Sequence, residues 1–341
     1  MKRTPIIVTG GAGFIGSHTV LQLLENGYQP VIVDDFSNSE PFIIDRLHEL
    51  CGETLPFFQC DCTDENAFRK VFESVKPSGI IHFAAFKAVG ESVQFPLKYY
   101  HNNIGSLVVL LKLMKEFGVS DLVFSSSCTV YGQPEIVPVS ENSPAKNAMS
   151  PYGYTKVVCE QIIQDCVASG QQLRTVMLRY FNPIGAHASG RIGELPRGVP
   201  NNLVPYITQT AAGTRKSLTV HGNDYATPDG TCIRDYIHVV DLADAHVKSL
   251  DWLAKQAEQP GVEIFNVGTG NGNTVLEVVQ TFEKVNQLQL PYTIGPRRSG
   301  DVEQIWASTS KAEEMLNWKP RLSLADALRD AWSWEQNLKK G

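Results

Sequence analysis

The sequence lacks the features that are typical of membrane-spanning and nucleic-acid-binding proteins. No apolar run approaches the roughly 20 residues that a bilayer-spanning helix needs, so we expect no membrane partner. There are 30 lysines and arginines against 36 aspartates and glutamates, a net charge of −6 that argues against nucleic acid as a partner. A length of 341 residues, 43% of them hydrophobic, allows one large domain with or without a smaller appendage.

The cysteines lack the spacing of a metal or redox site. They number seven, which is odd, and one residue separates the thiols of Cys60-Asp-Cys62 where a zinc or redox pair has two. We therefore predict no metal site, reduced thiols and a cytoplasmic location. Cys128 is open to two interpretations, a reactive thiol or a small buried residue, and the second is the commoner use of cysteine.

The first 180 residues alternate β-rich runs with amphipathic stretches. Strands are expected at Pro5–Thr9, Pro30–Asp34, Pro56–Cys60, Gly79–Phe83, Asp121–Ser125 and Leu173–Leu178. Helices are expected at Phe14–Asn26, Glu65–Val75, Ile104–Phe117 and Tyr152–Ala168. Strands alternating with helices of this length are typical of right-handed βαβ units. The pattern predicts an α/β fold with a Rossmann-type doubly wound parallel sheet.

After Asn182-Pro183 the sequence becomes richer in glycine, proline and asparagine. Helices are expected at Asn202–Ala212, Val239–Lys255, Val275–Asn286, Ser310–Leu316 and Ser323–Lys339, with a return to the sheet at Glu263–Val267. We therefore predict a dinucleotide-binding domain over residues 1–182, with later returns near 232–267. A smaller C-terminal α/β substrate-binding lobe is predicted over 183–341. Ligands of open α/β sheets bind beyond the C-terminal ends of the strands, so the cleft between lobes is the expected site.

A glycine-rich turn, with Gly10, Gly13 and Gly16, directly follows the first predicted strand and opens the first helix. In this context glycines allow a tight turn and place a pyrophosphate at the helix N-terminus. Asp34 ends the second strand and is suited to hydrogen-bond the adenosine ribose diol, where it would repel a 2′-phosphate. No arginine occurs at 35–38, which favours NAD over NADP. Asp61, with Cys62 beside it, follows the third strand and is placed to approach the adenine.

A tyrosine and a lysine four residues apart form the predicted acid/base. Tyr152 and Lys156 project from the same face of a helix, and a nearby ammonium favours the phenolate of a phenol whose ordinary pKa is about 10. The phenolate can then take a proton from a sugar or alcohol hydroxyl while a nicotinamide takes the hydride. The run Ser125-Ser126-Ser127 ends the preceding apolar strand, so it is placed to face this pair.

Together these residues resemble the extended short-chain dehydrogenase/reductase family, and within it the UDP-glucose 4-epimerases. The resemblance covers essentially the whole chain. Longer strings carry it: Phe86-Lys-Ala-Val-Gly-Glu-Ser92, Tyr99-Tyr-His-Asn-Asn103, Arg179-Tyr-Phe-Asn-Pro183, Asp229-Gly-Thr-Cys-Ile-Arg-Asp-Tyr-Ile-His-Val239 and Arg297-Arg-Ser-Gly-Asp301. It implies a homodimer built through the helices at Ile104–Phe117 and Tyr152–Ala168, although the sequence alone supports these equally well as helices that pack on the sheet. It also implies reversible C4 epimerisation of UDP-galactose and UDP-glucose through a 4-keto intermediate, on tightly bound NAD that is regenerated each cycle.

The resemblance also implies residue roles. Tyr152 is the acid/base at the sugar 4-hydroxyl, Lys156 binds the nicotinamide ribose and lowers the tyrosine pKa, and Ser127 hydrogen-bonds the reacting oxygen. Residues implied to line the NAD site, besides the glycine turn, are Phe14, Ile15, Phe83, Lys87, Asn102 and Phe181. Residues implied to hold the UDP-hexose are Asn182, Asn202, Leu203, Arg234, Arg298 and Asp301. Guanidinium groups suit a diphosphate through planar, charge-assisted hydrogen bonds.

Substrate specificity and some contacts stay open at this point. His221 stands where an aromatic commonly borders the uracil in this family, and a simple loop histidine is an equal alternative. Ile305 stands where a tyrosine restricts the site to non-acetylated hexoses and a small residue admits the 2-N-acetyl sugars. A UDP-N-acetylhexosamine 4-epimerase is therefore an alternative.

Two rival classes are weaker. In the related 4,6-dehydratases an Asp-Glu pair follows the threonine after the serine run, whereas here Thr129 is followed by Val130-Tyr131. A UDP-glucuronate decarboxylase or epimerase usually has an acidic residue near this threonine, and none is present. A catalytically inactive NAD sensor typically loses the tyrosine or lysine, and this chain keeps both.

Overall fold

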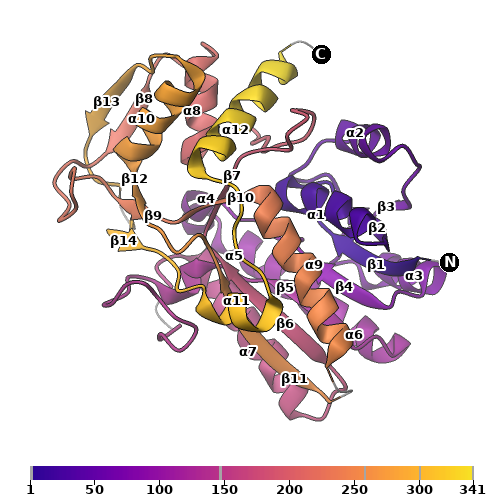
Figure 1. Ribbon diagram of the computed structural model, residues 1–341. Helices are drawn as coiled ribbons and strands as arrows, with labels where there is room; N and C mark the ends of the chain where they lie inside the picture. Colours follow the sequence, from indigo (N-terminus) through magenta and orange to yellow (C-terminus); the bar gives the residue numbers. More distant parts are fainter. Residues whose placement is uncertain (1–2, 146–147, 257–258, 299–300, 340–341) are drawn as a thin grey trace.

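The core of the protein is a seven-stranded parallel sheet. A computed structural model describes residues 3–145, 148–256, 259–298 and 301–339, and its strand order is β11-β6-β5-β4-β1-β2-β3 (Figure 1). These strands are β1 (Thr4–Thr9), β2 (Tyr28–Asp34), β3 (Phe57–Gln59), β4 (Gly79–His82), β5 (Asp121–Ser125), β6 (Arg174–Tyr180) and β11 (Gly261–Val267). The predicted Rossmann-type sheet is confirmed, including the late return of the chain at β11. Ser299 and Gly300, in the string that ends at Asp301, lie outside the described residues.

Helices cover both faces of the sheet, which explains why its strands are apolar on both sides. One face packs against α1 (Phe14–Glu25), α2 (Phe42–Cys51) and α9 (Val239–Lys255). The other packs against α3 (Glu65–Val75), α6 (Gly105–Phe117) and α7 (Pro151–Ala168). Figure 1 shows α9 lying beside α1 in front of the sheet. The alternation of a strand is visible in β1, where Ile6 and Val8 enter the first core and Ile7 the second.

A second, smaller core lies at the upper left of Figure 1. It is built from α8 (Leu203–Ala211), β8 (Leu218–His221), α10 (Val275–Asn286), β13 (Tyr292–Gly295) and α12 (Leu324–Leu338). Short strands link it to the sheet: β7 (Asn182–Ile184) pairs with β10 (Tyr236–His238), and β9 (Ile233–Arg234) pairs with β12 (Asn273–Thr274) and β14 (Gln304–Ile305). The remaining helical elements are α4 (Val89–Gln94), α5 (Pro96–Tyr99), a π-helix (Tyr100–Ile104), a 3₁₀ turn (Cys128–Tyr131) and α11 (Ser310–Leu316). The domain limits 1–182 and 183–341 stay a prediction.

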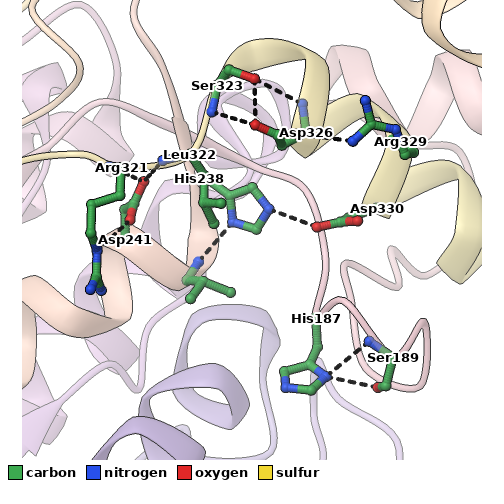
Figure 2. Close-up of polar contacts among 11 residues, drawn as sticks. His187, Ser189, His238, Asp241, Arg321, Leu322, Ser323, Asp326, Arg329 and Asp330 are labelled. Atoms are coloured by element: carbon green, nitrogen blue, oxygen red, sulfur yellow. Dashed lines mark hydrogen bonds and ion pairs between the residues drawn. The ribbon is translucent and has the colours of Figure 1, made fainter.

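The C-terminal helix is attached where β10 passes into α9 (Figure 2). The ring of His238 accepts a hydrogen bond from the Val240 amide at 3.1 Å through Nδ1, and its Nε2 lies 3.2 Å from Oδ2 of Asp330 in α12. Asp241, in the first turn of α9, accepts hydrogen bonds from the backbone N–H groups of 321–322 at 3.0 and 2.9 Å. A capping box between Ser323 and Asp326 then starts α12. These contacts tie the smaller core to the sheet.

Among the helices of the described residues, none is both long and apolar enough to cross a bilayer.

Candidate active site

A cavity of about 1170 Å³ opens at the C-terminal ends of the parallel strands. This is the position at which open α/β sheets bind their ligands. Its lining includes most of the residues proposed from the sequence: Gly10, Gly13, Phe14, Ile15, Gly16, Asp34, Asp61, Cys62, Phe83, Lys87, Asn102, Tyr152, Lys156, Asn182, Asn202, Arg234, Arg298, Asp301 and Ile305. The fold thus gathers residues separated by almost 300 positions around one space.

The glycine turn has the shape of a phosphate cradle. Gly10 adopts a left-handed conformation, with φ of 68°, and a Cβ added to Gly16 would lie 2.2 Å from the carbonyl oxygen of Gly10. Gly13 gives α1 no side-chain cap, and the first turn of the helix has no acidic residue. The helix N-terminus therefore presents backbone N–H groups and a partial positive charge to the cavity, which fits a pyrophosphate.

Asp34 is held rigidly at the end of β2. Its Oδ1 accepts hydrogen bonds from the Ser39 hydroxyl at 2.7 Å and the Phe36 amide at 2.9 Å, and Oδ2 accepts from the Ala12 amide at 3.0 Å. Burial raises the pKa of this carboxyl, and the three hydrogen bonds oppose the rise. The carboxylate is thus fixed beside the glycine turn, which fits a ribose diol next to the pyrophosphate.

The proposed acid/base lies at the start of α7. Ser150 caps the helix by accepting the Gly153 N–H at 3.2 Å, and Pro151 occupies its first position, so Tyr152 lies in the first turn. Lys156 follows one turn later and donates from Nζ to the carbonyl oxygen of Ser125 at 2.7 Å. Tyr152 and Lys156 are both buried. The side chain of Ser127, at the end of the serine run, interacts with that of Tyr152 and acts to lower the pKa of the phenol.

The pKa of Tyr152 differs from the sequence-based expectation. Burial, with a smaller contribution from Tyr180, raises it well above the ordinary value, and the hydrogen bond from Ser127 only opposes that rise. The expected lowering by Lys156 is not seen; the lysine cation is directed at the Ser125 carbonyl. Burial also lowers the pKa of Lys156 to about 8. Burial of Tyr152 therefore disfavours the phenolate in the polypeptide alone.

The substrate side of the cavity is polar and basic. Arg298 donates to both carboxylate oxygens of Asp301, at 2.8 to 3.2 Å, and Arg234 lies 3.9 Å from the same carboxylate. Pairing of β9 with β14 sets Arg234 against Ile305. The Oδ1 atom of Asn182 is buried and has no hydrogen-bond partner in the part of the chain that the structure describes. A buried acceptor of this kind fits a hydroxyl or amide donor of a ligand.

Four residues proposed from the sequence do not line the cavity. Ser127 is buried behind the cavity wall and interacts with Tyr152, which does line the cavity. Phe181 is buried in a small cluster with Cys128 and Ile305. Leu203 packs in the smaller core. His221 is exposed at the end of β8, where its Nδ1 lies 3.2 Å from the Pro296 carbonyl oxygen.

Two residues at the site were not identified from the sequence. Oε1 of Glu194 accepts hydrogen bonds from Lys87 at 2.8 Å and Asn202 at 2.7 Å, and so joins one residue from each side of the cavity. Asn103 bonds the Phe86 backbone at 2.9 and 3.0 Å and the Thr155 hydroxyl at 3.1 Å, which fixes the loop after β4 against α7. Asn103 could have been identified, because it ends one of the sequence strings that carry the family resemblance. Nothing in the local sequence around Glu194 indicated a role for that residue.

Comparison with known proteins agrees with this geometry. A family model described as GDP-mannose 4,6 dehydratase matches residues 7–331. UDP-glucose 4-epimerase 2 of Arabidopsis thaliana is 51% identical, over 97% of this chain and 95% of the plant protein. The UDP-glucose 4-epimerase of Stenotrophomonas maltophila, solved with NAD and formylated UDP-arabinopyranose, is 45% identical with a TM-score of 0.95 and covers 99% of both chains. That of Bifidobacterium longum, solved with NAD+ and UDP, is 44% identical with a TM-score of 0.95, covering 99% of this chain and 100% of the other.

Proposed function

The chain belongs to the UDP-glucose 4-epimerase family of extended short-chain dehydrogenases/reductases, and we propose that it interconverts UDP-galactose and UDP-glucose by NAD-dependent epimerisation at C4. The observation that carries this function is the convergence of Tyr152, with Ser127 beside it, the glycine cradle and Arg234 on one cavity. The cavity thus joins a dinucleotide site, an acid/base and a diphosphate site.

Different residues of the chain transfer the proton, hold the reacting oxygen and bind the diphosphate. Bound NAD supplies the hydride acceptor and donor at C4, together with a positive charge on its oxidised nicotinamide. Tyr152 takes the 4-hydroxyl proton as the 4-keto sugar forms, and returns it when the opposite face is reduced. Ser127 holds the reacting oxygen and stabilises the phenolate by its hydrogen bond. Arg234 and Arg298 hold the diphosphate, so that the hexose can turn over without loss of the intermediate.

The two positions after Thr129 supply no acid/base for dehydratase chemistry. Val130, the residue after Thr129, is fully buried, and the Tyr131 hydroxyl donates to Oδ1 of Asn266 at 2.6 Å, so these two side chains support the core. Retention of Tyr152 and Lys156 in the cavity argues equally against an inactive NAD sensor. Epimerisation needs no second acid/base at these two positions.

The activity is tested by incubating the purified protein, without added NAD, with UDP-galactose. We expect UDP-glucose to form, since NAD that is regenerated each cycle should remain bound through purification. The products are followed by proton NMR or anion-exchange chromatography. A parallel incubation with UDP-N-acetylgalactosamine tests the gate at Ile305, which is buried at the cavity beside Arg234. Slower conversion of the acetylated sugar is expected; no reaction of either sugar, even with NAD supplied, would contradict the proposed function.

We also propose that the enzyme is a homodimer that pairs through α6 and α7. Val108 on α6 and Tyr154 on α7 expose their side chains on the sides of these helices that face away from the sheet. Burying such apolar surface favours association. Sedimentation velocity should give the mass of two chains, and Val108→Glu should shift the protein towards one chain. A native protein that sediments as a monomer at micromolar concentration would exclude the dimer.

A cytoplasmic location is proposed from the thiols. All seven cysteines are unpaired, and four of them, Cys60, Cys62, Cys128 and Cys159, are buried with a raised pKa. Burial is the main cause of each rise, and a thiol with a raised pKa is a poor nucleophile. The burial and the raised pKa of the Cys128 thiol therefore support its interpretation as a small buried residue rather than a reactive thiol.

A further inference from the structure

Arg197 joins the substrate side of the fold to the loop that follows β2. Its guanidinium donates to the carbonyl oxygens of Ser37 at 2.9 Å and Ser39 at 2.7 Å, and to the carboxylate of Glu40 at 3.0 Å. These partners are about 160 residues away in the sequence, and Arg197 and its partners all line the cavity. A planar guanidinium can satisfy three acceptors in fixed geometry, which a single exposed ion pair does not do.

The loop held by Arg197 is the one that fixes Asp34. Arg197 bonds the carbonyl of Ser39, and the hydroxyl of the same Ser39 donates to Oδ1 of Asp34. The Phe36 amide, also in this loop, donates to the same oxygen. Movement of the loop would therefore disturb the carboxylate placed to bind the adenosine ribose.

The segment that carries Arg197 is anchored at its other end. Asn337 in α12 donates to the Gly190 carbonyl at 3.0 Å, and the Trp334 indole donates to the Glu194 carbonyl at 3.0 Å. Gly193 lies flat on Trp334, since an added Cβ would come within 2.5 Å of its ring. The segment 190–197 thus runs from a fixed base on α12 to the β2–α2 loop across the cofactor end of the cavity.

We propose that Arg197 is a clasp that closes this segment on the β2–α2 loop and slows the release of the adenine dinucleotide. The inference rests on the proposed function in so far as the enzyme must keep NAD between cycles. Arg197 is a positioning residue: it acts on the cofactor through Ser39 and Asp34. Breaking its three hydrogen bonds frees the loop and opens the adenosine end of the cavity, while the catalytic groups on α7 are untouched.

The test measures how fast bound NAD leaves the purified holoenzyme. The protein is diluted into an NAD glycohydrolase, which destroys released cofactor, and the NAD still bound to protein is quantified over time after rapid filtration. Arg197→Gln should release NAD faster by a factor on the order of ten, because hydrogen bonds to a charged group are lost. Glu40→Gln should have a smaller effect, because the two bonds to backbone carbonyls remain.

Arg191 offers a matched control. It lies in the same segment and makes one ion pair with Glu49 of α2, but it does not line the cavity. Arg191→Gln should release NAD at the native rate, because single exposed ion pairs contribute little. An unchanged release rate in Arg197→Gln, or equal acceleration in both variants, overturns the clasp.

The clasp and the proposed function fail in different ways. Epimerase activity is assayed on the native protein, and NAD release is measured on the native protein and on Arg197→Gln, so the two readouts are separate. A native protein that lacks epimerase activity but releases NAD faster after the substitution contradicts the function and supports the clasp. A native protein that binds no NAD contradicts both.

Discussion

The variant Tyr152→Phe is expected to epimerise UDP-galactose more slowly than the native enzyme by a factor on the order of 10² or more. The substitution removes only the phenolic oxygen that takes and returns the proton of the 4-hydroxyl. Tyr152 is 6% exposed, and phenylalanine fills nearly the same volume, so the fold and the NAD site should be kept. The loss should therefore fall on the turnover number, with little change in the binding of UDP.

Tyr154 provides the matched control for this experiment. It lies in the same turn of α7 but is 47% exposed, away from the cavity lining. Tyr154→Phe should keep native turnover. The comparison is made from initial rates at saturating UDP-galactose, with NAD content and circular dichroism checked for each variant. If Tyr152→Phe turned over at a near-native rate with its NAD bound, the phenol would not be the acid/base.

The main sheet could be predicted because its signals are local. The strand Asp121–Ser125 and the helices Glu65–Val75 and Val239–Lys255 occur with the predicted bounds, since each is a periodic run with clear ends. The helix α2 (Phe42–Cys51) was missed: it follows a loop of polar residues and its first turn begins after Pro41 without a side-chain cap. The two- and three-residue strands that link the smaller core to the sheet were also missed, because tertiary pairing creates them.

The parts of the site that a single short motif forms could be predicted from the sequence. The glycine turn and the Tyr152–Lys156 pair lie on a strand–helix junction and a single helix, so spacing alone sets their geometry. The electrostatics were not predictable in this way. Whether Lys156 faces the phenol or a carbonyl depends on how α7 packs on β5, and the raised pKa of Tyr152 follows from burial. Glu194 and Arg197 act across long sequence distances, which no local pattern reports.

The variant Glu160→Ala is expected to lower the free energy of unfolding by about 3–5 kcal/mol. Glu160 lies in α7 one turn after Lys156 and forms a two-pronged ion pair with Arg179 of β6, at 2.9 and 2.6 Å; both side chains are 5% exposed. Burial works to lower the pKa of Arg179, but the hydrogen bonds and charge of Glu160 outweigh it and raise that pKa. Without the carboxylate, a guanidinium that stays charged is left buried and uncompensated.

The remaining partners of Arg179 cannot replace that carboxylate. The Tyr131 hydroxyl at 3.1 Å and the Glu141 carbonyl at 3.4 Å are neutral acceptors. Glu160→Gln should therefore also destabilise, by less than Glu160→Ala, since the amide keeps one acceptor and fills the space. Urea denaturation at a fixed NAD concentration measures the loss, because bound cofactor itself stabilises the folded state.

An exposed glutamate in α6 separates this effect from the general loss of an ion pair. Glu116 pairs with Arg69 at a site where its side chain is 47% exposed, so Glu116→Ala should change stability by no more than about 1 kcal/mol. Glu160 also accepts the Ser126 hydroxyl at 2.5 Å, next to Ser127, so its loss loosens the contact between α7 and β5 that sets Tyr152 against Ser127. A Glu160→Ala protein as stable as Glu116→Ala would show that water or a shifted backbone compensates Arg179. The ion pair would then not be what fixes the catalytic helix to the sheet.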